Sequence, residues 1–424
     1  MNTLRLNSTG PEVELLQSTL STLGFYSYMI DGIFGFRTHA AVQTFQKEFK
    51  LIPDGIVGEL TWQSLMPYIN GYANYKIKEN DTLYEISKNF NTTVEAILAS
   101  NPEIDPENLQ IDNTIVIPFG NVVKTNISYT SQILDLNINS LKVIYPFLET
   151  GFIGYSVLGK QIPYIKFGKG KKEILHLAST HANEWITTPL LMKFIEYLSK
   201  SYVNNKNIHD INPHKLFEEI SLYIIPMLNP DGVDLVTGLL DENSRAYNNA
   251  KAIASNYPSL SFPDSWKANI EGIDLNLQFP AGWEKAKEIK YSEGFSRPAP
   301  RDFVGYGPLT APESVNIYNF ILTHNFKTML TYHSQGRVIY YQYQDITPPG
   351  SLELAEIFSK ESGYLLESIP EESSYAGLKD WFIYFYNKPG FTIEVGLGNN
   401  PLPISQFTGI YRENLGILIS SLLY

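Results

Sequence analysis

The sequence predicts a multi-domain protein: a small three-helix domain, a small domain of two helices between two strands, and a large α/β domain with a mixed sheet flanked by helices. Three observations support this prediction. The chain has 424 residues, more than one ordinary hydrophobic core holds. Helical periodicity with an internal repeat fills the first 68 residues. Short apolar runs then alternate with helical patterns over residues 125–424.

Composition excludes several classes of protein. The net charge is −12 and there is no long basic run, so we expect no nucleic acid partner. Without cysteine, disulfides, thiol catalysis and thiolate metal sites are excluded. No stretch approaches the length of a transmembrane helix, so we expect no membrane insertion. The first residues lack the pattern of a secretory signal, and we therefore expect either a mature form or a protein made in the cytoplasm.

Residues 1–68 form the first predicted domain. The segments PEVELLQSTLSTLG (11–24) and HAAVQTFQKEF (39–49) each place apolar residues on one helical face. The motif DGIFGFRT (31–38) recurs as DGIVGELT (54–61), and Asp-Gly is a turn former. Together these motifs resemble the three-helix peptidoglycan-binding domain of bacterial wall hydrolases, which implies that peptidoglycan is a partner.

Residues 75–119 form the second predicted domain, after a predicted linker at 68–74. We expect short strands at 75–78 and 114–117 and two helices between them, with Asp81 and Thr92 as N-caps. The pattern Y-x-I-x-x-x-D-T-L-x-x-I-S, followed by N-T-x-V-E-x-I-L-x-x-N-P, resembles a LysM domain. The resemblance implies binding to glycans that contain N-acetylglucosamine, and two tandem modules imply avidity for one polymer.

Residues 125–424 form the third predicted domain, with one large mixed sheet covered on both faces. The predicted strands are the apolar runs at 173–179, 221–229, 327–334, 337–343 and 390–397. The predicted helices are 186–202, 311–324, 352–361 and 404–423.

Polar residues follow these runs, where ligands of α/β sheets gather. His181 and Glu184 follow the first run, His333 ends another, and Glu394 lies in TIEVG. The segment 274–280 is expected to end a further run. Two histidines and one carboxylate around zinc, with one position left for water, are typical of a catalytic rather than a structural zinc site. Glu394 is then a candidate to take a proton from that water.

The order H-x-x-E, P-x-x-N-P-D-G, G-I-D-L-N, Y-H-S and T-I-E-V-G resembles the zinc carboxypeptidase family from about residue 157 to 417. The resemblance implies one zinc ion held by His181, Glu184 and His333, and Glu394 as general base. Lys267 lies near the position where the family often has an arginine that stabilises the oxyanion. A lysine supplies the charge without the bidentate fork of arginine.

The resemblance also implies residues that bind substrate. Asn276 matches the asparagine that holds a terminal carboxylate, and Tyr375 matches a mobile tyrosine, although the spacing to Asp380 is shorter than usual. Most members carry an arginine directly after this asparagine, whereas this chain has Leu277. An α-carboxylate clamp is therefore weakened, which favours an endopeptidase. Lys379 matches a position of the specificity pocket, where a cation would favour an acidic side chain.

Several residues have two interpretations. Arg337 and Arg301 are candidates to bind an anion, or they form surface salt bridges. Asp231 either orients His181 or belongs to the turn of N-P-D-G. His176, inside a predicted strand, is expected in the core.

The phrases YHSQG and DLNLQFPAGW resemble a subgroup of the family from spore-forming bacteria. The implied activity is hydrolysis of the γ-D-glutamyl–diaminopimelate bond in peptidoglycan stem peptides, by a cytoplasmic or spore-associated protein that acts on the wall or its fragments. Two alternatives are an ordinary carboxypeptidase acting on free peptides and a non-catalytic wall-binding protein.

Overall fold

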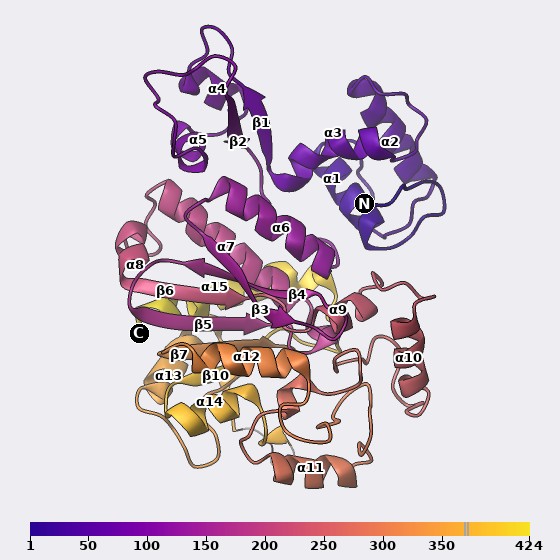
Figure 1. Ribbon diagram of the computed structural model, residues 1–424, viewed down its shortest axis with the longest axis vertical. Coiled ribbons are helices and arrows are strands. Elements are labelled where there is room, and N and C mark those ends of the chain that lie inside the picture. The colour runs from indigo at the N-terminus through magenta and orange to yellow at the C-terminus, as the bar shows by residue number, and fades with distance from the viewer. Residues whose placement is uncertain (369, 371–372) are drawn as a thin grey trace. The chain divides into compact units, whose positions relative to one another are not determined.

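A computed structural model describes residues 1–368, 370 and 373–424 (Figure 1). The chain forms two compact units. The first contains Met1–Ser128, Gln132–Glu149 and Glu196–Pro213, and the second contains Tyr129–Ser131, Thr150–Ile195 and His214–Tyr424. Among the described residues, no helix has the length and apolar character needed to cross a bilayer.

The first 70 residues form the three predicted helices, α1 (Pro11–Thr22), α2 (Phe36–Glu48) and α3 (Glu59–Asn70). The internal repeat has a structural cause. The buried Gln17 amide donates to Asp31, and its carbonyl oxygen accepts the backbone N–H groups of the Asp31-Gly32 turn. Gln46 likewise donates to Asp54 and accepts the Gly55 N–H. Each repeat thus contains a turn tied to a buried glutamine, which satisfies that side chain's polar groups.

The next segment pairs β1 (Tyr72–Lys76) antiparallel with β2 (Thr114–Pro118), with α4 (Leu83–Asn89) and α5 (Val94–Ser100) between them. The predicted N-caps are wrong by one residue, because Thr82 and Thr93 accept the capping hydrogen bonds. Asp81 instead accepts from the Lys78 N–H and the Tyr75 hydroxyl. The predicted linker is also wrong, because only Gly71, in a left-handed conformation, separates α3 from β1.

In the rest of the chain, the helices are α6 (Ser131–Ile144), α7 (Thr187–Val203), α8 (Pro213–Glu219), α9 (Pro230–Val236), α10 (Arg245–Ala254), α11 (Trp283–Ser292), α12 (Pro312–Leu322), α13 (Ser351–Ser362), α14 (Leu378–Tyr386) and α15 (Phe407–Leu423). The strands are β3 (Glu149–Tyr155), β4 (Gln161–Phe167), β5 (Lys172–Ala178), β6 (Ile220–Ile225), β7 (Thr328–His333), β8 (Val338–Tyr340), β9 (Leu365–Leu366) and β10 (Gly390–Glu394). Short 3-10 turns include η1 (Ala182–Glu184), η2 (Leu275–Leu277) and η4 (Ile404–Gln406).

The described strands of the second unit form one eight-stranded sheet in the order β3-β4-β6-β5-β7-β10-β8-β9. β6, β5, β7 and β10 are parallel neighbours, while β4 and β8 pair antiparallel with β6 and β10. The predicted mixed sheet is confirmed, and each of the five predicted strands overlaps an observed one. The segment 274–280 ends no strand; it contains η2 instead.

Helices cover both faces of this sheet (Figure 1). On one face, Leu175 and Leu177 of β5 share a core with α12 and α14. On the other face, His176 contacts Ser421 of α15 and stacks near Phe194 of α7. This alternation follows from the two-residue period of a strand. His176 is fully buried, and burial lowers its pKa to about 3, so it is a neutral core residue as expected.

Candidate active site

The candidate site lies where three parallel strands end. β5 is followed by η1, which is preceded by His181 and ends with Glu184. His333 is the last residue of β7, and Glu394 is the last of β10. β7 lies between β5 and β10, and its register pairs His333 with Glu394. The carboxyl ends of neighbouring parallel strands meet at one edge of a sheet. The topology therefore gathers four polar side chains that are far apart in the sequence.

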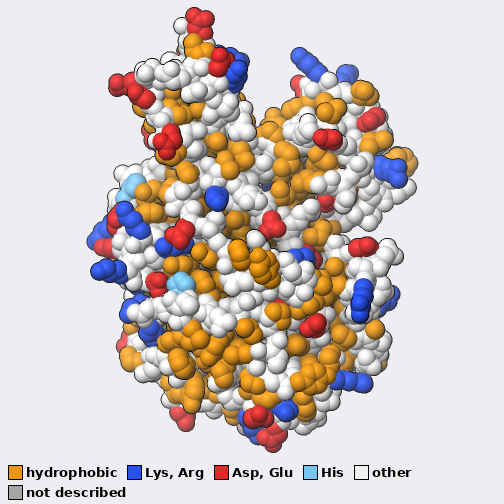
Figure 2. Space-filling model, viewed as in Figure 1, with side chains coloured by type: hydrophobic (Ala, Val, Ile, Leu, Met, Phe, Trp, Pro, Cys, Tyr) orange, Lys and Arg blue, Asp and Glu red, His pale blue; other side chains and the backbone are white. Residues whose placement is uncertain are grey.

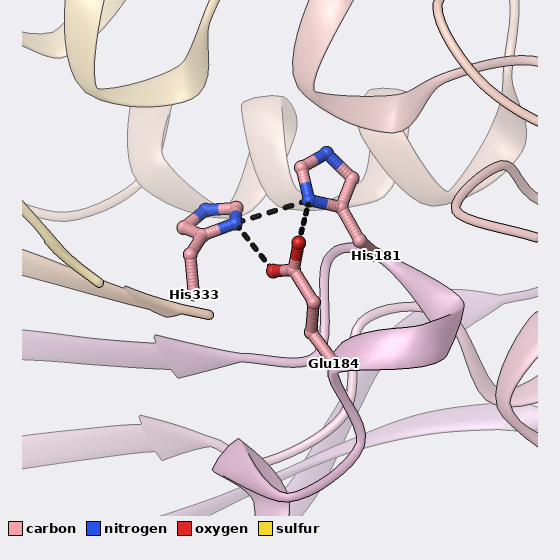
Figure 3. Close-up of side chains that lie close together, drawn as sticks. All are labelled: His181, Glu184 and His333. Carbon is pink, nitrogen blue, oxygen red and sulfur yellow. Dashed lines mark hydrogen bonds and ion pairs between the residues drawn. The ribbon is translucent and has the colours of Figure 1, made fainter. Parts of the chain in front are cut away.

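His181, Glu184 and His333 point toward one another (Figure 3). Nδ1 of His181 lies 2.9 Å from Oε1 of Glu184, and Nδ1 of His333 lies 2.9 Å from Oε2. The two Nδ1 atoms are 3.2 Å apart. All three side chains are buried, and their ligand atoms lie within 4.8 Å of one another. Among the described residues, this is the one group of His, Asp and Glu side chains with metal-ligand spacing.

These three residues fit a zinc ion. Two Nδ1 atoms that face each other at 3.2 Å need a proton or a cation between them. Bonds of about 2.0–2.2 Å at tetrahedral angles place zinc ligands about 3.3 Å apart, close to the separations observed. The ligand chemistry also fits, because two imidazoles and one carboxylate are the set that leaves a coordination position open in catalytic sites.

Asp274 orients the first histidine. Its Oδ1 lies 3.2 Å from Nε2 of His181, the ring nitrogen that faces away from the triad. A carboxylate there holds the proton on Nε2 and leaves Nδ1 free to bind metal. Asp231, the other candidate for this role, has different partners. It is the second residue of α9, accepts from the Leu158 N–H and pairs with Lys160 at 3.3 Å.

Replacing Asp274 by asparagine is expected to lower zinc affinity by about 10–100-fold, because the ring of His181 loses its orienting charge. Competition with a zinc-binding dye would measure this affinity. Asp231→Asn is the matched control, and its affinity should stay near the wild-type value. Equal losses in both variants would contradict the assignment of Asp274.

The N-P-D-G motif packs against η1. Asn229 caps α9 by accepting the Gly232 N–H at 3.1 Å, and it donates to the Ala268 carbonyl oxygen at 2.9 Å. A side chain at Gly232 would lie 2.8 Å from Ala182, which lies between His181 and Glu184 in the chain. Glycine is therefore required by the close approach of α9 to η1. The motif is structural, and its role is to position η1.

Charges inside the site shift its pKa values strongly. Burial lowers the pKa of His181, but Glu184 and Asp274 outweigh it and raise the value to about 9. Burial raises the pKa of Glu394, and the charge of Glu184 raises it further. Burial lowers the pKa of Lys267, yet Glu184 and Asp274 raise it on balance, so this lysine stays charged. Its Nζ lies 3.6 Å from Oε1 of Glu184.

One pocket opens onto these residues. Its lining includes His181, Lys267, Asp274, Asn276, Leu277, Asp302, His333, Tyr340, Lys379, Asp380, Thr392 and Glu394. Asn276 and Leu277 lie on η2, and Oδ1 of Asn276 accepts the Leu378 N–H at 3.0 Å. Lys379 is 3% exposed, donates to the Gln342 carbonyl oxygen at 2.7 Å and pairs with Asp380 at 2.5 Å.

Three predicted substrate residues are absent from the pocket lining. Tyr375 is absent from the pocket lining and packs in an apolar cluster with Leu277 and Trp283. Arg337 pairs with Glu413 at 3.0 Å, and Arg301 pairs with Asp302, which lines the pocket. Both arginines thus form salt bridges, and binding of an anion by either stays a prediction. The structure thus brings Asn276 and Lys379 to the pocket but not these three side chains.

Sequence reasoning missed Asp274 as a partner of His181, and it missed Tyr340 and Thr392 as pocket residues. Asp274 lies two residues before Asn276, a candidate to bind substrate. This closeness in the sequence was the signal that could have identified Asp274. Tyr340 and Thr392 sit in apolar strands and gave no such signal.

Comparison with known proteins assigns the three segments. Residues 138–416 match the family described as zinc carboxypeptidase. Residues 9–65 match a peptidoglycan binding domain, and residues 75–118 match the LysM domain.

Individual relatives agree with these matches. γ-D-Glutamyl-L-diamino acid endopeptidase 1 of Lysinibacillus sphaericus is 44% identical over 295 residues, covering 70% of this chain and 72% of that protein. The spore cortex-lytic enzyme of Oceanobacillus iheyensis is 39% identical over 72 residues, 17% of this chain and 26% of that enzyme. Among solved structures, carboxypeptidase A of Helicoverpa armigera has a TM-score of 0.52 at 16% identity, covering 97% of this chain and 95% of that one. At that identity the likeness concerns the fold alone.

Proposed function

The chain belongs to the zinc carboxypeptidase family, and from this we propose that it hydrolyses the γ-D-glutamyl–diaminopimelate bond of peptidoglycan stem peptides. The observation that carries this proposal is the combination of a His-Glu-His triad with wall-binding modules on one chain. The identity to an endopeptidase of that specificity supports it. The protein is thus a zinc metallopeptidase.

In this proposal His181, Glu184 and His333 hold one zinc ion, supported by the spacing and burial of their ligand atoms. Bound zinc supplies Lewis acidity, which polarises a carbonyl group and acidifies water. Asp274 keeps the proton of His181 on Nε2, and Glu184 places its two carboxylate oxygens toward the two histidines. The chain's own residues thereby present three fixed ligand atoms.

Glu394 acts as general base. It takes a proton from water as the water oxygen bonds to the carbonyl carbon, and it returns that proton to the leaving amine when the C–N bond breaks. Its place beside His333 in the strand register supports this role. Lys267 lines the same pocket, and Glu184 and Asp274 favour its charged form by raising its pKa. Its positive charge stabilises the negative oxygen of the transition state.

The pocket also supports the substrate assignment. Leu277 lines the wall where an arginine would grip a terminal α-carboxylate, so the site tolerates a residue that continues into D-Ala. Asn276 is anchored to the Leu378 N–H and presents its amide group at this wall. The buried ammonium of Lys379 faces the specificity pocket, where it attracts the free carboxylate of diaminopimelate.

The N-terminal modules bind cell-wall glycan and hold the catalytic domain near its polymer. On the face drawn in Figure 2, basic and acidic side chains are interspersed without a continuous basic patch. We further propose action on the wall of sporulating cells or on fragments of it, which the short match to a spore cortex-lytic enzyme supports. Recovery of the protein from purified spores and from vegetative cells would test this location.

Digestion of L-Ala-γ-D-Glu-meso-diaminopimelate, with and without a following D-Ala, is expected to release L-Ala-D-Glu. Mass spectrometry would identify the products, and enzyme treated with a zinc chelator is the control. Trimming of ordinary peptides from their C-termini, with both stem peptides intact, would identify a carboxypeptidase of free peptides. No turnover of either substrate by zinc-loaded protein would identify a wall-binding protein without catalysis.

A further inference from the structure

Tyr340 lies in the wall of the specificity pocket. It ends β8, and the antiparallel register places it directly opposite Thr392 of β10. Side chains directly opposite each other across an antiparallel pair project from the same face, with Cβ atoms about 4.5–5.5 Å apart. Both residues line the pocket together with Lys379. The phenol is thus a second polar group in the pocket assigned to the diamino acid side chain.

The hydroxyl of Tyr340 is available to a ligand. Among the described residues this hydroxyl has no hydrogen-bond partner, and the side chain is partly exposed. Burial raises the pKa of this phenol, and the charges of Glu394 and Glu367 raise it further. The Tyr340 hydroxyl therefore keeps its proton at neutral pH and is a hydrogen-bond donor without an acceptor among the described residues.

The two polar side chains of the pocket named with Tyr340, Lys379 and Thr392, are already engaged. Lys379 uses two of its three N–H groups on Gln342 and Asp380, and the carboxylate of Asp380 offsets its charge. Thr331 donates to the Phe391 carbonyl oxygen at 3.1 Å, which leaves its oxygen to accept from Thr392 at 3.2 Å. A carboxylate that binds beside Lys379 and Thr392 thus finds one N–H of Lys379 there, and the Tyr340 hydroxyl is a second donor.

We infer that Tyr340 is a specificity-determining residue whose phenol O–H donates to the distal carboxylate of diaminopimelate, beside the remaining N–H of Lys379. This inference rests on the proposed function. It explains how a pocket in which Lys379 is already paired with Asp380 can distinguish a diamino acid with a distal carboxylate from one without it. L-Lysine differs from diaminopimelate by that one group, so it is the matched substrate for a test.

The test compares Tyr340→Phe with wild type on stem peptides that carry meso-diaminopimelate or L-lysine at the third position. Hydrogen bonds to charged groups are strong, so kcat/KM for the diaminopimelate peptide is expected to fall by about tenfold or more. The value for the lysine peptide should stay near that of wild type, which also reports that the variant is folded. Tyr341→Phe, at the next position and outside the pocket lining, is the control and should leave both values unchanged.

The outcomes separate this inference from the proposed function. If wild type cleaves the diaminopimelate peptide but Tyr340→Phe lowers both substrates equally, or neither, the inference fails and the proposed function stands. If zinc-loaded wild type cleaves neither peptide, the proposed function fails and the inference falls with it. A selective loss on diaminopimelate in Tyr340→Phe alone supports both.

Discussion

Glu394→Gln is expected to lower kcat on the stem peptide by about 10³-fold while zinc content stays at the wild-type level. Glutamine keeps the shape of the side chain but cannot take a proton from water. Glu394 is not a member of the metal triad, so its loss leaves the three ligand atoms in place. Steady-state kinetics and metal analysis on the same preparation would give both quantities.

The matched control for this variant is Glu367→Gln, the same change at an exposed position after β9. Its kcat and zinc content should equal those of wild type. Two results would contradict the role of Glu394: a kcat within a few-fold of wild type, or a loss of zinc that accounts for the lost activity. The second result would place Glu394 among the groups that hold the metal.

His333→Ala is expected to weaken zinc binding by more than the 10–100-fold typical of changes to outer partners, because it removes one of three ligand atoms. It also leaves Glu184 with one buried histidine partner instead of two. Ligand binding stabilises a folded protein by about 2.7 kcal/mol at a free concentration of 100 Kd. Zinc should therefore raise the melting temperature of wild type but not of His333→Ala at the same zinc concentration.

The control for the triad is His209→Ala, which changes an exposed histidine outside the site. Zinc should stabilise this variant as it stabilises wild type. An undiminished thermal shift in His333→Ala would contradict its assignment as a ligand, whatever happens to the activity. The readout is independent of turnover, so it separates metal binding from damage to the pocket.

Local patterns predicted the central strands well. β5, β6, β7 and β10 are buried along nearly their whole length, so each appears in the sequence as an apolar run. The edge strand β3 was not predicted, because its residues are half-buried or exposed and include two glycines. The two N-caps were each misplaced by one residue, since two adjacent residues with capping side chains stand before each helix.

The candidate site also contains residues that local patterns predicted well and others that they did not. Residues predicted from the ends of apolar runs come together, because parallel strands deliver their carboxyl ends to one edge. Tyr375, Arg337 and Arg301 lie outside regular strands and helices, and they are absent from the pocket lining. Side chains on irregular segments depend on contacts that local periodicity does not encode.

The sequence by itself determined the order of modules, the α/β class of the third segment and the chemical groups available for a metal site. Only the tertiary structure decided that Asp274 rather than Asp231 meets His181, 93 residues away along the chain. It also decided that Tyr340 faces Thr392 in the pocket wall. The physical reason is that periodicity tells which face of an element is buried, whereas strand order and register decide which buried groups become neighbours.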